Sequence, residues 1–268
     1  METLIQIFMF MFGAIIGSFL NVCIYRLPKN QSIIFPASHC TTCNRGLFWQ
    51  DNIPIISYIS LRGKCRFCNA KISPRYLIVE FLTATLLLLL YVIFGFSAKF
   101  FAYAVFTGGL IVATFVDFEI QEIPDQISLG GIVVGLISAA IFPSIFDTAS
   151  RLSSVLNSFF GVIAGAAVIY IMKILGTAAF KDRVKALGVD SAMGDGDVKL
   201  MAMIGAFLGW KLVIVTFFIA PLFGAVVGVF LKLKYGREII PYGPYLSLAA
   251  MIAMVFGNKI LGIFFGGL

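Results

Sequence analysis

Long apolar stretches recur along almost the whole chain and restrict what it can fold into. A membrane-crossing helix needs about 20 mostly apolar residues, and eight segments are candidates. They are residues 4–25, 76–96, 98–118, 127–146, 154–176, 198–210, 212–232 and 243–265. The sixth is short, so we expect it to cross only partly. The sequence therefore predicts an all-α polytopic membrane protein with about eight transmembrane helices and one long polar loop, residues 26–75.

The composition excludes other classes of protein. Of the 268 residues, 60% are hydrophobic and only 12% are charged, whereas soluble domains average about 25% charged residues. Too few charges remain to cover a soluble surface, and the hydrophobic content argues against disorder. The net charge of +7 would suggest nucleic acid in a soluble protein. Here we assign the positive charges to membrane orientation and expect no nucleic-acid partner.

The distribution of Lys and Arg indicates the orientation of the spans. If the loop of residues 26–75 faces the cytoplasm, all but four of the 20 Lys and Arg are cytoplasmic. The four outside are Lys99, Arg151, Lys211 and Lys259. The positive-inside rule favours this orientation. No basic residue precedes the apolar stretch from Leu4 to Ile24, so we expect a retained span rather than a cleaved signal peptide.

Four of the five cysteines lie in the polar loop. Cys40-x-x-Cys43 and Cys65-x-x-Cys68 are separated by 21 residues, a pattern typical of a tetrahedral Zn²⁺ site with four thiolates. Disulfides are the alternative, but thiols stay reduced in a cytoplasmic loop. Because a four-sulfur shell leaves no open position, we expect a structural rather than a catalytic zinc ion. Cys23, in the first span, is most simply a packing residue.

Six of the 13 acidic residues gather at two membrane boundaries on the predicted cytoplasmic side. They are Asp117, Glu119, Glu122 and Asp125 after the third span, and Asp195 and Asp197 within Gly194-Asp-Gly-Asp197 before the sixth. Ionisable residues at span ends are candidates for function, although solvation or the helix dipole also explains Asp195, Glu119 and Glu122. That alternative suits Asp117 less well, because it ends an apolar helix where the dipole disfavours a carboxylate.

Paired carboxylates can carry out peptide hydrolysis. Two that share one proton supply an ionised general base for water and a protonated group that polarises the substrate carbonyl. Gly194 and Gly196 allow the backbone to approach closely beside Asp197. No His-Glu-x-x-His metalloprotease motif is present in the sequence.

With these motifs in this order, the chain resembles the type IV prepilin peptidases, bacterial membrane enzymes of the GxGD aspartyl protease type. The resemblance covers nearly the whole chain. The matching segments are Gly17–Pro28, both cysteine pairs, Asp51–Pro54, Leu61–Cys65, Ile72–Tyr76 with Glu80, Asp117 with Ile123–Asp125, Gly194–Asp197 and Ile240–Tyr245.

The resemblance implies that Asp117 and Asp197 are the catalytic pair. It implies cleavage of a short basic leader from prepilins or pseudopilins, after a Gly, at the cytoplasmic face of the bacterial inner membrane. It also implies methylation of the new α-amino group with S-adenosylmethionine, because the zinc loop marks the bifunctional members of the family. The expected partners are these substrates and membrane lipid.

Other residues have weaker assignments. We expect Glu119, Glu122 and Asp125 to attract the basic leader while the apolar helix of the substrate stays in lipid. No Gly-x-Gly-x-x-Gly loop indicates a Rossmann-type cofactor site, so residues 17–28 and the zinc loop are the polar material available for methylation. Residues 242–244 either shape a substrate groove or form a simple turn.

The expected organisation is a first span at residues 1–25, the zinc loop at residues 26–75 associated with methylation, and a membrane peptidase domain at residues 76–268. Three alternatives stay open. The chain could be a peptidase without methylation, a transporter that uses its boundary acids as an ion path, or an anchoring protein with a zinc knuckle. The acids lie at one membrane face rather than at midplane, which disfavours the transporter.

Overall fold

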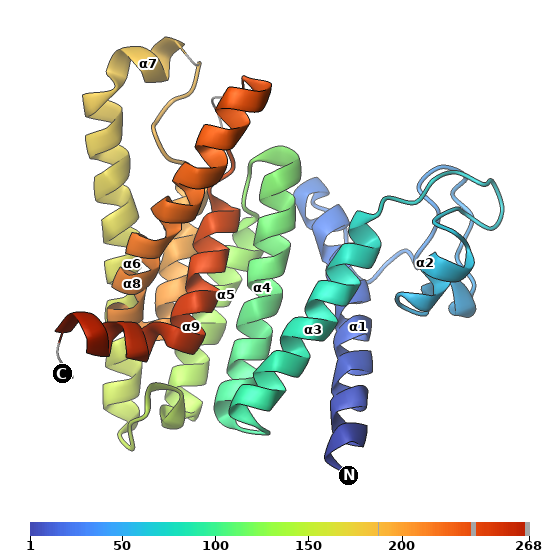
Figure 1. Ribbon diagram of the computed structural model, residues 1–268, viewed down its shortest axis with the longest axis horizontal. Helices are drawn as coiled ribbons and strands as arrows, with labels where there is room; N and C mark the ends of the chain where they lie inside the picture. Colours follow the sequence, from blue (N-terminus) through green and yellow to red (C-terminus); the bar gives the residue numbers. More distant parts are fainter. Residues whose placement is uncertain (187, 237–239, 266–268) are drawn as a thin grey trace. The chain divides into compact units, whose positions relative to one another are not determined.

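The computed structural model describes residues 1–186, 188–236 and 240–265 of the chain. Within these ranges the regular structure is helical (Figure 1). The α-helices are α1 (Glu2–Arg26), α2 (Ile56–Ser60), α3 (Arg75–Phe94), α4 (Ala98–Ile120), α5 (Asp125–Ile141), α6 (Arg151–Ala179), α7 (Lys181–Ala186), α8 (Asp195–Tyr235) and α9 (Gly243–Phe265). Six of them, α1, α3, α4, α6, α8 and α9, are long and apolar enough to cross a membrane. The predicted all-helical, multi-pass membrane protein is confirmed.

The apolar segments are helical as expected, but two details differ from the expected eight spans. Helix α5 has only 17 residues, fewer than the other long helices. The expected sixth and seventh spans both lie in α8, whose 41 residues form two helices joined directly across a kink at Gly209, where the backbone angles are non-helical (φ 76°, ψ 170°). Glycine tolerates this positive φ because it has no Cβ atom. The chain therefore changes direction there without a polar loop.

The chain forms two compact units, residues 1–112 and 113–268. In the first unit, α1 packs closely along α3 (Figure 1). A Cβ atom on Gly13 would lie 2.7 Å from the Cα atom of Ala84, and one on Gly17 would lie 2.7 Å from the Cα atom of Glu80. Glycines allow such close backbone approach between membrane helices. The contact places Glu80 at the helix interface.

In the second unit, the first half of α8 is the central helix. Residues 200–209 are buried without exception, and α5, α6 and α9 pack against α8. A helix that is apolar on every side is buried within a bundle. Helix α6 comes close enough that a Cβ atom on Gly205 would overlap the backbone of Gly161. The Ser158 hydroxyl donates a hydrogen bond to the Ala206 carbonyl oxygen at 2.7 Å, which links the same two helices.

The contact between α6 and α8 predicts different tolerance of two glycines. We expect Gly205→Ala to lower the free energy of unfolding by about 1–3 kcal/mol, because the added methyl overpacks the interface. Gly130→Ala in α5 is the matched control, because no described atom lies within 4 Å of its Cβ position. Thermal unfolding of both purified variants in detergent measures the difference. Equal Tm values for the two variants would contradict the close contact.

Candidate functional site

Asp117 is buried at the end of α4, with 5% of its surface exposed. Its Oδ2 atom accepts a hydrogen bond of 2.8 Å from the backbone N–H of Gly243, the first residue of α9. A Cβ atom at position 243 would lie 2.8 Å from the same Oδ2 atom. A side chain at position 243 would therefore crowd this contact, which ties the end of α4 to the start of α9.

Asp197 lies in the first turn of α8 and is 9% exposed. Its Oδ2 atom accepts a hydrogen bond of 3.2 Å from the backbone N–H of Gly194, and the positive end of the helix dipole favours a carboxylate there. The neighbouring Gly196 packs on Ile123, whose Cβ atom lies 3.1 Å from the position of a Cβ on Gly196. Ile123 also lies 3.3 Å from the corresponding position on Gly243. Ile123 therefore lies beside both Gly196, which precedes Asp197, and Gly243, whose N–H binds Asp117.

Tyr242 supplies further evidence that the two aspartates are neighbours. Burial raises the pKa of the Tyr242 phenol to about 12, and the nearby negative charge of Asp197 adds to this shift. Tyr242 directly precedes Gly243, whose N–H holds Asp117. The carboxylates of Asp117 and Asp197 also lie close enough to interact electrostatically. The structure thus brings these two distant residues together in the second unit.

The hydrogen bond from the Gly243 backbone N–H to Asp117 was not predicted from the sequence. The sequence singled out residues 242–244 only as a turn or a groove wall. A backbone donor has no side-chain signature, so the only signal was a glycine directly before an apolar span.

The other boundary acids face solvent. Glu119 and Glu122 are exposed. The Asp125 carboxylate forms an ion pair of 2.6 Å with Lys199, and the exposed Asp195 pairs with Lys173. The acids at these boundaries therefore differ in burial, although they lie in the same two short segments.

The four cysteines of the polar loop come together in the first unit. The Sγ atoms of Cys40, Cys43, Cys65 and Cys68 lie within 4.8 Å of one another, and those of Cys40 and Cys68 are 3.9 Å apart. Four sulfurs at about 2.3 Å from a tetrahedral Zn²⁺ ion would be about 3.8 Å apart. All four cysteines are free thiols. The cluster therefore fits a zinc ion.

The two cysteine pairs have the same backbone structure. The N–H groups of Cys40 and Cys65 each donate 2.9 Å bonds to the carbonyl oxygens five residues later. The N–H groups of Asn44 and Asn69 bond back to the two cysteine carbonyls, and both asparagines have a positive φ. A hydrogen bond from the Cys43 backbone N–H is the main cause that lowers the pKa of the Cys40 thiol to about 6. This hydrogen bond favours the thiolate that metal binding requires.

Buried polar residues attach the polar loop to the helices of the first unit. The Arg26 guanidinium donates bonds of 2.9 and 2.7 Å to the carbonyl oxygens of Ser32 and Pro36. Glu80 Oε2 accepts a 2.7 Å bond from the Ile55 N–H. Asn21 Nδ2 donates a 3.0 Å bond to the Tyr76 carbonyl oxygen and so links α1 to α3.

Two protein-family models match the chain. The Bacterial Peptidase A24 N-terminal domain matches residues 11–94, and the Type IV leader peptidase family matches residues 104–229. The first match contains the cysteine cluster, and the second contains both buried aspartates. No solved structure matches the chain.

Similar proteins span most of its length. The chain is 32% identical to a prepilin leader peptidase/N-methyltransferase of Pseudomonas aeruginosa, over 92% of this chain and 89% of that protein. It is also 32% identical to a protein of the same name from Bacillus subtilis, over 96% of both chains. A relative of that name from Aeromonas hydrophila is 32% identical over 94% of this chain and 90% of its own length. The chain therefore belongs to the type IV leader peptidase family.

Proposed function

We propose that this protein is an aspartic-type peptidase that removes the basic leader of type IV prepilins and pseudopilins and then methylates the new N-terminus. The observation that carries the peptidase assignment is that Asp117 and Asp197 are both buried and close enough to interact electrostatically, in a chain of the leader peptidase family. The relatives' names include both activities. A transporter or a non-enzymatic anchor is not favoured by the family.

The paired aspartates suit hydrolysis by activated water. One ionised carboxylate takes a proton from water as the water oxygen attacks the scissile carbonyl carbon, while the other, protonated, carboxyl donates to the carbonyl oxygen. The tetrahedral intermediate collapses as the C–N bond breaks and the amine leaves with a proton. The Gly243 N–H orients Asp117 for this task, because its 2.8 Å bond occupies one carboxylate oxygen. Burial excludes bulk water from the charge that develops.

The two aspartates lie at helix ends, a position that suits cleavage of a membrane-anchored prepilin. Asp117 ends α4 and Asp197 begins α8, so we place the scissile bond at the cytoplasmic face of the bacterial inner membrane. The apolar helix of a prepilin stays in lipid, and its Lys- and Arg-containing leader meets the exposed acids. Glu119, Glu122 and Asp125 are all exposed and are the candidates for this contact.

Methylation belongs to the first unit in this proposal. The sequence predicted a division at residue 75, whereas the compact units divide after Val112. We assign the first unit to methylation and the second to cleavage. S-adenosylmethionine would supply an electrophilic methyl group. The substrate amine would form the new N–C bond as the C–S bond breaks, its proton passing to water and the electron pair to sulfur. The zinc ion stabilises the loop, because four thiolates leave it no open position.

Removal of either catalytic carboxylate should stop cleavage. We expect Asp117→Asn and Asp197→Asn each to lower kcat for a model prepilin by about a hundred- to ten-thousand-fold, because general acid–base catalysis is lost. Asp195→Asn is the matched control, since this residue is in the same motif but is exposed and paired with Lys173. Purified protein and a gel-shift assay of the leader give the rates. Cleavage that survives either catalytic substitution would refute the pair.

Neutralising the exposed acids should weaken substrate binding. We expect Glu119→Gln combined with Glu122→Gln and Asp125→Asn to raise KM several-fold with little change in kcat, because solvent-exposed charge pairs contribute about 1 kcal/mol or less each. The effect should shrink in high salt, which screens exposed charges. An unchanged KM at low salt would exclude these acids from leader binding.

The cysteine cluster should hold one zinc ion per chain. We expect Cys65→Ser to lose the metal and to destabilise the loop, because one of four ligands is removed. Cys23→Ser is the matched control, since Cys23 lies outside the cluster. Metal analysis of purified protein measures the stoichiometry. Wild-type protein without stoichiometric zinc, or Cys65→Ser with a full complement, would contradict the assignment.

A further inference from the structure

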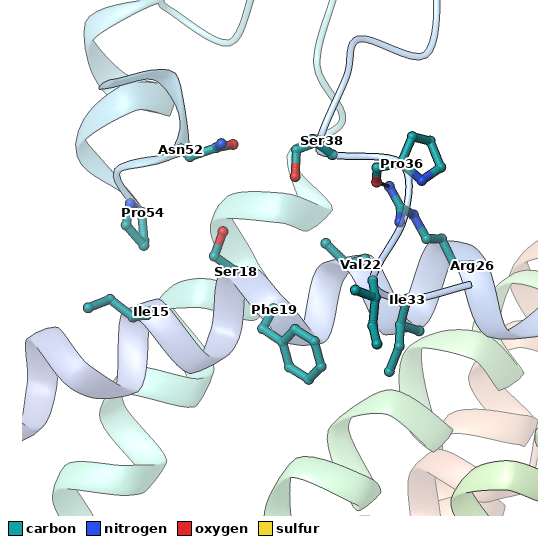
Figure 2. Close-up of a pocket in the computed structure, with 12 residues that line it drawn as sticks. Ile15, Ser18, Phe19, Val22, Arg26, Ile33, Pro36, Ser38, Asn52 and Pro54 are labelled. Carbon is teal, nitrogen blue, oxygen red and sulfur yellow. Dashed lines mark hydrogen bonds between the residues drawn. The ribbon is translucent and has the colours of Figure 1, made fainter. Parts of the chain in front are cut away.

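A cavity of about 450 Å³ lies between α1 and the polar loop in the first unit (Figure 2). Helix α1 contributes apolar side chains and Ser18 to one wall, and two stretches of the loop form the rest. The lining includes Ser18, Phe19, Val22, Arg26, Ser38 and Asn52. Pockets of about 300–1,000 Å³ with apolar walls and a few polar groups are typical of small-molecule sites.

Two buried charged residues hold the walls of this cavity in place. Arg26 is 6% exposed, and its guanidinium bonds to the carbonyl oxygens of Ser32 and Pro36, the first loop stretch. Glu80 is 7% exposed and holds the N–H of Ile55, next to the lining residue Pro54. Ile55 has a positive φ of 65°, which is costly for a β-branched residue and persists only where the surrounding structure holds it.

The zinc cluster supports the same walls. Ser38 lines the cavity and lies two residues before the ligand Cys40. Arg66, within the second cysteine pair, donates from Nη2 to Oδ1 of Asp51 at 2.7 Å and from Nε to Oδ2 at 3.2 Å. Asp51 adjoins the lining residue Asn52. An ordered metal site therefore fixes both loop stretches that close the cavity, which gives a structural zinc ion a role in forming a binding site.

We infer that this cavity is the binding site for S-adenosylmethionine. The inference rests on the proposed methyltransferase activity and assigns a site to it. Of the five N–H donors of Arg26, two contact loop carbonyls, which leaves donors for the methionine carboxylate. Phe19 adds apolar surface to the lining on the side of α1 away from Ser38 and Asn52 (Figure 2). Ser18, Ser38 and Asn52 offer hydroxyl and amide groups to ribose, and Val22 supplies apolar surface for adenine.

Direct binding tests the site without relying on turnover. Full-length protein in detergent is titrated with S-adenosylmethionine and with S-adenosylhomocysteine by calorimetry. Val22→Phe fills the cavity, and Asn52→Ala removes a polar contact. We expect Val22→Phe to raise Kd at least tenfold and Asn52→Ala to raise it severalfold. Both variants should retain full zinc content and wild-type cleavage of a prepilin.

Val92→Phe is the matched control, because it makes the same substitution at an exposed position of α3 outside the cavity lining. It should bind as wild type does. Unchanged Kd in both cavity variants would overturn the site while leaving the methyltransferase assignment intact. Wild-type protein that cleaves but binds neither nucleoside would overturn the site and the methyltransferase assignment, but not the peptidase. Lost binding in the variants of a protein that does not cleave would support the site and refute the peptidase.

Discussion

A carboxylate buried at the end of an apolar helix needs hydrogen-bond donors, and the candidate active site depends on how that need is met. The dipole at the end of α4 is unfavourable for Asp117, and the structure supplies the backbone N–H of Gly243 instead. Asp197 lies at the start of α8, where the helix dipole favours a carboxylate, and it accepts a hydrogen bond from the Gly194 N–H. Two carboxylates can therefore be buried beside each other because helix starts supply backbone donors to both.

The same requirement organises the first unit. The buried side chains of Asn21, Arg26 and Glu80 are paired mainly with backbone groups of the loop or of α3. These bonds give each side chain a hydrogen-bond partner in apolar surroundings, where an unpaired polar group is costly, and they also determine the path of the loop. The glycines of α1 make this possible, because they let α3 come close enough for Glu80 to reach the loop. The cysteine cluster then fixes the far part of the loop.

Much of the architecture could be predicted from apolar length alone. The helices agree with the apolar segments because a membrane requires every backbone group to be bonded internally. The boundary expected between the sixth and seventh spans, at residues 210–212, lies beside the kink at Gly209. Hydropathy located this break, but it could not show that the two helices follow each other directly. The cysteine spacing indicated a shared metal site, and the four sulfur atoms do converge.

The sequence by itself determined the class of protein, the membrane segments, the four cysteines that could hold a metal ion and, through family resemblance, the candidate aspartates. Those properties depend on residue type and local spacing. Only the tertiary structure decided that Gly243 holds Asp117, that Asp125 and Asp195 face solvent in ion pairs, and that a cavity forms between α1 and the loop. These features depend on backbone groups and on residues far apart in the chain, and folding brings them together without a local sequence signal.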